Sequence, residues 1–362
     1  MCAERLANDK NMIKTEPEDF IVEELPLYEP SGVGTHTFFA MRKRNLGTLE
    51  AINRLARELH VNARHIGYAG LKDKRAVTTQ VLSVEGIAPE KVLALELPAI
   101  EILWAKPHPH KLRVGHLRGN RFEITVREVA PAALKTAQSA MERLAKEGVP
   151  NRFGTQRFGH HNDSHLIGKA LVQSEWETAA RYLVTAEGDI ARRVRRKMAR
   201  NSAEKAVASI PNRLRKLLLS AYQAHLFNLV LEQRLPKLGH LLDGDIAIKH
   251  SNGAPFLVEN AEVEQQRANA FEISPSGPVF GYKMRTPMGA VQALEAAVLA
   301  TEGVAPAAFR RVAGIRLPGT RRPLRMPVEV HQLAAVDIGL RLVFTLPPGG
   351  YATVVLEELK FA

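Results

Sequence analysis

The chain has 362 residues, 45 % hydrophobic and 24 % charged, a composition typical of a folded globular protein of about two or three domains. Its 50 lysines and arginines against 38 acidic residues give a net charge of +12, which favours a polyanionic partner, nucleic acid first. The single cysteine excludes an intrachain disulfide and a cysteine-based zinc site, and without a signal-peptide pattern or a membrane-length apolar run we expect a cytoplasmic protein.

The first 150 residues predict a mixture of strands and helices. Alternating apolar residues indicate strands, and apolar residues at helical spacing indicate helices. Thr48 stands where it could cap the first helix, and Gly148 follows the second as a stop signal. The predicted strands are 18–25, 36–43 and 121–129, and the predicted helices are 49–59 and 132–146.

After Gly148 the chain becomes rich in alanine and arginine and mostly helical. The clearest helix is 214–235, which is apolar around most of its circumference and is ended by Pro236. We expect loops at 274–289, a linker at 319–327 and a strand-like end at 340–359 with a turn after Leu346. Strand-rich ends around a helix-rich middle predict one domain inserted into another.

The motif GYAGLKDKRAVTTQ (67–80) places one carboxylate, Asp73, between Lys72 and the pair Lys74–Arg75 on a predicted loop between two strands. One interpretation is an ordinary turn, in which an aspartate bonds to nearby backbone N–H groups. The other is a reactive carboxylate, whose flanking cations favour its ionised form and hold the phosphates of an RNA beside it. A carboxylate nucleophile suits attack at a sugar or at an electron-poor ring.

Two further clusters carry charge or metal-binding side chains. ARRVRRKMAR (191–200) holds six cations, which predicts either a solvated face or a surface that follows phosphates. GHHNDSH offers His160, His161, Asp163 and His165, but this spacing fits no zinc site, so we expect no metal. The chain also has no Walker loop, GxGxxG or GxSxG motif.

Five segments together resemble the TruD family of tRNA pseudouridine synthases, in the order that this family has them. They extend over nearly the whole chain, so the resemblance is specific. The segments are KTEPEDFIVEE (14–24), GYAGLKDKRAVTTQ (67–80), LRGNRF (117–122), NRFGTQRFG (151–159) and LPPGGYATVVLEEL (346–359).

The resemblance implies an α+β protein with the pseudouridine-synthase fold, a mixed, mainly antiparallel sheet with helices. Residues 1–147 plus 326–362 would form the catalytic domain, and 148–325 the inserted, helix-rich α/β TRUD domain. It implies a catalytic role for Asp73 and RNA contacts for its basic neighbours. The residues implied in substrate binding are Phe20, Asn120, Tyr351, Phe122 and Lys14, and those implied in RNA binding are Lys72, Lys74 and Arg75. Some family members carry Phe where this chain has Tyr351, and a Tyr ring stacks as well.

The implied activity is isomerisation of uridine to pseudouridine, at uridine 13 in the D-arm of certain tRNAs, by a monomer. The reaction adds no group and involves no redox change, so it implies no cofactor. Two alternatives stay open: a non-catalytic basic RNA-binding protein, and a pseudouridine synthase with a broader RNA target. A glycosidase-like enzyme would need a second carboxylate, for which Glu18 and Asp19 are the obvious candidates.

Overall fold

The computed structural model describes residues 13–130, 132–159, 161–185 and 188–359, and the chain divides into two compact units. Unit 1 is Met1–Lys146 with Pro327–Ala362, and unit 2 is Glu147–Met326. Each boundary lies one residue from the position expected from the sequence.

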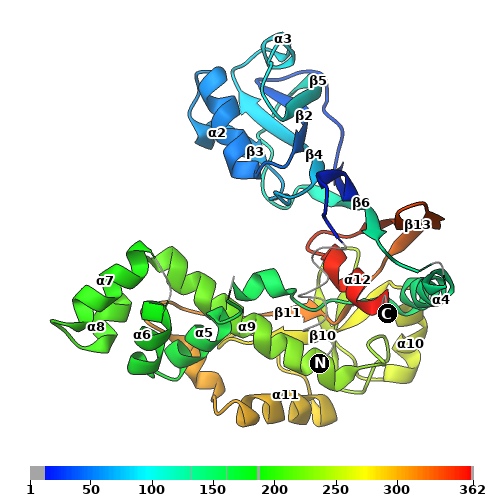
Figure 1. The fold of residues 1–362 in the computed structure, drawn as a ribbon. Coiled ribbons are helices and arrows are strands. Elements are labelled where there is room, and N and C mark those ends of the chain that lie inside the picture. Colours follow the sequence, from blue (N-terminus) through cyan, green and yellow to red (C-terminus); the bar gives the residue numbers. More distant parts are fainter. Residues whose placement is uncertain (1–12, 131, 160, 186–187, 360–362) are drawn as a thin grey trace. The chain divides into compact units, whose positions relative to one another are not determined.

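Unit 1 is built on an eight-stranded sheet in the order β13-β14-β6-β1-β4-β2-β5, with β3 paired to β4 (Figure 1). All neighbouring strands are antiparallel except β1 and β4, which run parallel. The prediction of a mainly antiparallel sheet with helices is therefore confirmed. The strands are β1 (Phe20–Pro26), β2 (His36–Arg44), β3 (Gly67–Tyr68), β4 (Val77–Glu85), β5 (Ile100–His108), β6 (Leu117–Arg127), β13 (Glu329–Val336) and β14 (Gly339–Leu346).

One face of β6 and β14 carries the apolar side chains that alternate along both strands. Phe122 lies opposite Phe344, and Ile124 lies opposite Leu342. The two phenylalanine rings stack with their centroids 5.5 Å apart, and all four side chains are buried. The alternation predicted for both strands is confirmed, and it directs these side chains into one core.

Helix α2 (Thr48–Glu58) packs its apolar face against β2 and β4. Thr48 does not cap it, as the sequence predicted, because the cap position is Gly47 and Thr48 is the first helical residue. The buried Thr48 hydroxyl donates instead to the side-chain oxygen of Gln80, at 3.0 Å.

Unit 1 has three other helices among its described residues: a short one after β4, one at the end of its first chain segment and one after β14. The segment after β14 was expected to be strand-like, but it forms a helix whose buried Val355 and Leu359 stand four residues apart, at helical spacing. These helices are α3 (Pro89–Leu93), α4 (Ala133–Glu147) and α12 (Ala352–Leu359), with 3₁₀ turns at Pro17–Asp19 and Ala63–His65.

The described residues of unit 2 form seven helices and six short strands, and α9 is the longest of these helices. Eleven residues of α9 are buried and lie on more than one side of it, which confirms the helix predicted at 214–235. The helices are α5 (Ser164–Val172), α6 (Trp176–Thr185), α7 (Asp189–Met198), α8 (Ala203–Ala208), α9 (Asn212–Arg234), α10 (Ala261–Asn269) and α11 (Gly289–Thr301), with 3₁₀ turns at Thr155–Phe158 and Pro306–Arg310. The strands are β7 (Val149–Pro150), β8 (Ile246–Lys249), β9 (Pro255–Leu257), β10 (Ile273–Val279), β11 (Thr320–Pro323) and β12 (Arg325–Met326).

The loop predicted at 274–289 is confirmed for residues 280–288 and wrong before them, where β10 occupies residues 274–279. The linker predicted at 319–327 is wrong, because β11 and β12 occupy most of it and β11 pairs with β10. Each half of β10 pairs with one neighbour, β8 or β11, which leaves edge positions where proline is tolerated. At Gly277 a Cβ would lie 2.9 Å from the Leu324 side chain and 3.0 Å from the Phe227 ring. Glycine here permits close packing rather than a loop.

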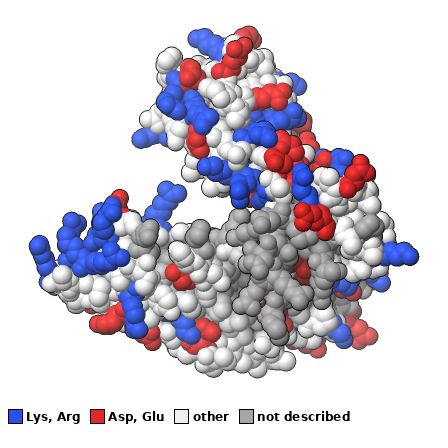
Figure 2. All heavy atoms as spheres, viewed as in Figure 1, with Lys and Arg blue, Asp and Glu red and all other residues white. Residues whose placement is uncertain are grey.

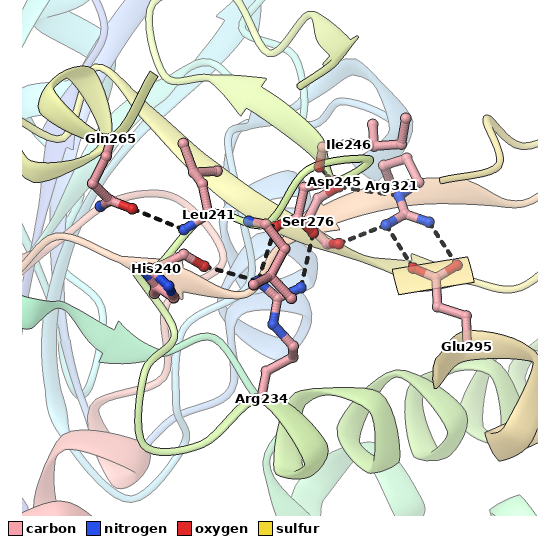
Figure 3. Close-up of polar contacts among 10 residues, drawn as sticks. Arg234, His240, Leu241, Asp245, Ile246, Gln265, Ser276, Glu295 and Arg321 are labelled. Atoms are coloured by element: carbon pink, nitrogen blue, oxygen red, sulfur yellow. Dashed lines mark hydrogen bonds and ion pairs between the residues drawn. The ribbon is translucent and has the colours of Figure 1, made fainter. Parts of the chain in front are cut away.

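Two buried ion pairs connect the sheet of unit 2 to its helices (Figure 3). Arg321 of β11 donates to both carboxylate oxygens of Glu295 in α11, at 2.8 and 2.9 Å, and to the Ser276 hydroxyl of β10. Arg234 of α9 donates to both oxygens of Asp245 in the same way, at 2.8 and 2.9 Å. Burial raises the pKa of Glu295, and the Arg321 guanidinium opposes that shift. Because an unpaired buried charge is strongly unfavourable, each pair favours the observed position of its two segments relative to each other.

Candidate active site

Asp73 lies on the loop between β3 and β4, as the sequence predicted. The start of β4 lies beside the start of β1, because the two strands are parallel with Ile21 opposite Val77. The segment that precedes β1 therefore reaches the loop that precedes β4. This topology brings Lys14 to Asp73 across 59 residues of sequence.

The Asp73 carboxylate forms an ion pair with Lys14, whose Nζ lies 2.9 Å from Oδ1. The Asp73 side chain is 33 % exposed, so solvent or a ligand reaches the carboxylate. The same Nζ lies 3.8 Å from the ring centroid of Phe20, within cation–π range. Lys14 has φ +67°, the left-handed region that lysine rarely adopts, and such residues concentrate at functional sites.

Lys43 of β2 lies behind the loop and is buried, with 1 % of its surface exposed. Its Nζ donates to the backbone carbonyl of Asp73 at 2.8 Å and to that of Leu46 at 2.6 Å. Burial lowers the pKa of Lys43 to about 8; the Asp73 charge raises this pKa and the Lys72 charge lowers it. This buried ammonium group therefore fixes the backbone that carries the Asp73 carboxylate.

Two further contacts hold the loop from its other side. The backbone N–H of Lys72 donates to the Thr48 hydroxyl oxygen at 2.9 Å. The side-chain amide of Gln80 donates to the carbonyl of Gly70 at 3.1 Å. With Lys43, the loop is bonded to α2, β2 and β4 through the backbone of residues 70, 72 and 73.

Lys72 occupies a position different from the predicted one. Its side chain is 6 % exposed, and its Nζ lies 2.8 Å from Oε2 of the buried Glu24 and donates to Oδ1 of Asn120 at 2.5 Å. In this structure the Lys72 ammonium group is thus directed inward and paired with Glu24 and Asn120. Its contact with RNA stays a prediction.

The predicted aromatic residues differ in how much surface they offer. Phe20 and Phe122 are 2 % and 6 % exposed and meet edge to face, with ring centroids 6.2 Å apart. Tyr351 is half-buried and follows the turn after β14, whose last residue, Leu346, lies opposite Asn120. The structure brings Phe20 and Phe122 together beside the Lys14–Asp73 pair, and Tyr351 follows five residues after Leu346.

The remaining charged residues of the motifs are separate from this arrangement. Lys74 and Arg75 are exposed on the loop. Glu18 pairs with Arg44 at 2.6 Å, and Asp19 pairs with Arg127 at 2.9 Å. The two acids considered for a glycosidase-like reaction are therefore each paired with an arginine, and neither is hydrogen-bonded to Asp73 in the part of the chain that the structure describes.

Sequence reasoning missed Lys43 and Glu24. Lys43 is buried between the exposed Arg42 and Arg44, and Glu24 shares the buried face of β1 with Phe20. The available signal was a charged residue at an inward position of an alternating strand, a position that is otherwise apolar.

No group of three or more metal-binding side chains occurs among the residues that the structure describes. The His165 ring contacts Phe158 edge to face, lies 4.6 Å from the His225 ring and is half-buried. His160 lies outside the described residues. Within the described ranges, no helix is both long and apolar enough to cross a bilayer.

We expect Lys43→Met to change how stability depends on pH. The folded-state pKa of Lys43 lies below its ordinary value of 10.5, so burial destabilises the wild-type protein while Lys43 is charged. This penalty is fully present below about pH 8 and is relieved as the pH rises toward 10.5. Relative to Lys43→Met, the wild-type free energy of unfolding should therefore increase by about 1 to 3 kcal/mol over this range.

Urea unfolding at several pH values measures this difference. Lys74→Met, which removes an exposed lysine from the same region, is the matched control and should run parallel to the wild type. Parallel pH curves for Lys43→Met and the wild type would contradict the expectation.

Comparison with known proteins gives a consistent result over the whole chain. The family model of tRNA pseudouridine synthase D (TruD) matches residues 8–202 and 186–359. The tRNA pseudouridine synthase D of Geobacter sulfurreducens is 43 % identical over 380 residues, covering 96 % of this chain and 93 % of the relative. That of Syntrophotalea carbinolica is 45 % identical over 378 residues, covering 96 % and 95 %.

A crystal structure from Methanosarcina mazei, described as tRNA pseudouridine synthase D (TruD), has the same fold. It superimposes with a TM-score of 0.83 at 26 % identity, over 97 % of this chain and 93 % of that chain. The predicted pseudouridine-synthase fold is thus confirmed. The match over both ends and the middle of the sequence shows that this chain belongs to the tRNA pseudouridine synthase D (TruD) family.

Proposed function

We propose that this chain isomerises uridine to pseudouridine in tRNA, with Asp73 as the nucleophile and uridine 13 of the D-arm as the target. The observation that carries the proposal is a partly exposed carboxylate that bonds to Lys14 and sits on a loop fixed from behind by the buried Lys43. A nucleophile held in one geometry loses little freedom on reaching the transition state.

The reaction breaks the bond between uracil N1 and ribose C1′ and joins C1′ to uracil C5. C5 then loses its proton and N1 takes one up, so that no atom is gained or lost overall. Asp73 attacks either C1′ or the uracil ring, and both routes need an ionised, accessible carboxylate. Lys14 orients the carboxylate through a charge-assisted hydrogen bond. The isomerisation needs no second substrate, so we propose that it proceeds without a cofactor, in a single chain.

We propose that Asn120 reads the edge of the uracil. The Lys72 ammonium group can only donate, so its bond fixes the Asn120 side-chain oxygen toward Lys72. The Asn120 NH₂ group is then directed elsewhere, as a donor. A donor matches a carbonyl oxygen of uracil and opposes the amino group that cytosine carries at the same ring position.

The target base must leave the folded RNA and stack in the site. Lys14 covers one face of the Phe20 ring, and Phe122 packs between Phe20 and Phe344, so these two rings form a supporting wall. We propose that the half-buried Tyr351 supplies the stacking face, which is worth about 1–3 kcal/mol per base. The exposed Lys74 and Arg75 would contact the phosphates of the same RNA segment.

The test is to incubate the purified chain with a mixture of tRNAs and map pseudouridine at single-nucleotide resolution. We expect conversion at position 13 of a subset of tRNAs and none when that uridine is replaced by cytidine. RNA that is retained on a gel without any converted uridine would indicate a non-catalytic binder. Conversion in ribosomal or messenger RNA would indicate the broader target.

We expect Asn120→Asp to lower kcat/KM by about 100-fold or more, because the carboxylate keeps the contact with Lys72 but no longer donates to uracil. The Kd for tRNA should change by less than about threefold, because phosphate contacts dominate affinity. Asn53→Asp, at an exposed position of α2, is the control and should leave kcat/KM unaltered. Wild-type activity in Asn120→Asp would contradict the role given to Asn120.

A further inference from the structure

Helix α7 presents an unusually basic surface on unit 2. Ala191 and Val194 are buried with no exposed area, and they attach the helix to the core of the unit. The other positions of residues 191–200, which extend two residues beyond the end of α7, are mainly cationic. All six cations are exposed: Arg192, Arg193, Arg195, Arg196, Lys197 and Arg200. Figure 2 shows the resulting concentration of basic side chains over α7 and α8, at the left of the view.

Little of this charge is neutralised within the described part of the chain. Arg192 forms an ion pair with Asp189 at the start of the helix, and both side chains are well exposed. Arg193 and Arg195 donate to backbone carbonyls, those of Ser209 and Val184, at 3.3 and 2.6 Å. A carbonyl partner leaves the guanidinium charge in place while it orders the side chain. Two arginines are thus positioned in advance and still positively charged.

The number of exposed arginines on α7 is larger than solubility alone would explain. Surfaces that serve solubility alone mix both signs, whereas this one is strongly of one sign. Five of the six cations are arginine, whose planar group binds phosphate through two parallel hydrogen bonds. A helix of ten residues is about 15 Å long, enough to contact several successive phosphates.

We propose that the basic face of α7 binds the sugar–phosphate backbone of the tRNA, at a place other than the uridine site around Asp73. The proposal rests on the proposed function, because tRNA is taken as the substrate. This face contributes affinity and salt dependence without reading sequence, since phosphate contacts position an RNA but do not specify its bases.

The test replaces three cations that have no side-chain bond to lose in the described structure: Arg196→Gln, Lys197→Gln and Arg200→Gln in one variant. The matched control removes the same charge from exposed positions elsewhere in unit 2, with Lys237→Gln, Lys283→Gln and Arg285→Gln. Both variants keep Arg193 and Arg195, so the bonds that hold α7 stay intact. Circular dichroism checks that both fold like the wild type.

The readout is the Kd for full-length tRNA at several salt concentrations. For the α7 variant we expect Kd to rise about tenfold or more near 0.1 M salt. The logarithm of the association constant decreases with the logarithm of the salt concentration, and we expect the magnitude of this slope to be smaller by about 2 to 3. KM should rise in parallel, and the control should change less than twofold. An α7 variant that binds tRNA like the control would overturn the proposal and leave α7 a solvated face.

The same experiment separates this proposal from the proposed function, because Kd is measured without turnover. Weaker binding by the α7 variant, in a protein whose wild type converts no uridine, would support the α7 surface and refute the isomerase activity. Full conversion by the wild type with no effect of the α7 variant on Kd would refute the α7 surface alone.

Discussion

The site depends on one physical constraint: a buried ammonium group must be surrounded by oxygen atoms. Lys43 and Lys72 are both inside unit 1, and desolvation makes an unpaired cation there strongly unfavourable. Their partners are the backbone carbonyls of Leu46 and Asp73, the carboxylate of Glu24 and the amide oxygen of Asn120. The backbone of the loop that carries Asp73 is thus bonded to buried groups, while the Asp73 carboxylate faces Lys14 and is partly exposed to solvent.

Because of this constraint, the three lysines of the site have different contacts. Lys14 contacts the carboxylate itself, Lys43 donates to the backbone carbonyl of Asp73, and Lys72 donates to the side-chain oxygen of Asn120. The first of these contacts involves a carboxylate that is partly exposed to solvent. A reaction that rearranges one nucleotide gains from such a rigid frame, because the reacting atoms must separate and rejoin without release of the base.

The sequence was sufficient to predict the strands that have one apolar and one polar face, and the helix α9. In these elements the buried side chains recur at the spacing of a strand or a helix, and this spacing is visible in the sequence. It also drew attention to Asp73 as a lone acid among cations, but this local pattern fits an ordinary turn as well, and only the family resemblance implied a catalytic role. It failed for Lys43, Glu24 and the inward turn of Lys72, because nothing in the local pattern says that a charged residue of a strand or loop has buried partners. Strand β10 was missed for a related reason: its prolines and glycine resemble a loop until Phe227 and Leu324 are known to pack against Gly277.

The central claim is that Asp73 is the nucleophile, and single-turnover conversion of tRNA by Asp73→Asn tests it most directly. Asparagine keeps the size of the side chain and an oxygen for Lys14, so the fold and the tRNA affinity should persist. The account predicts that the rate of pseudouridine formation falls by about 10³-fold or more while Kd stays within about threefold. A folded, tRNA-binding Asp73→Asn variant that forms pseudouridine at the wild-type rate would contradict it.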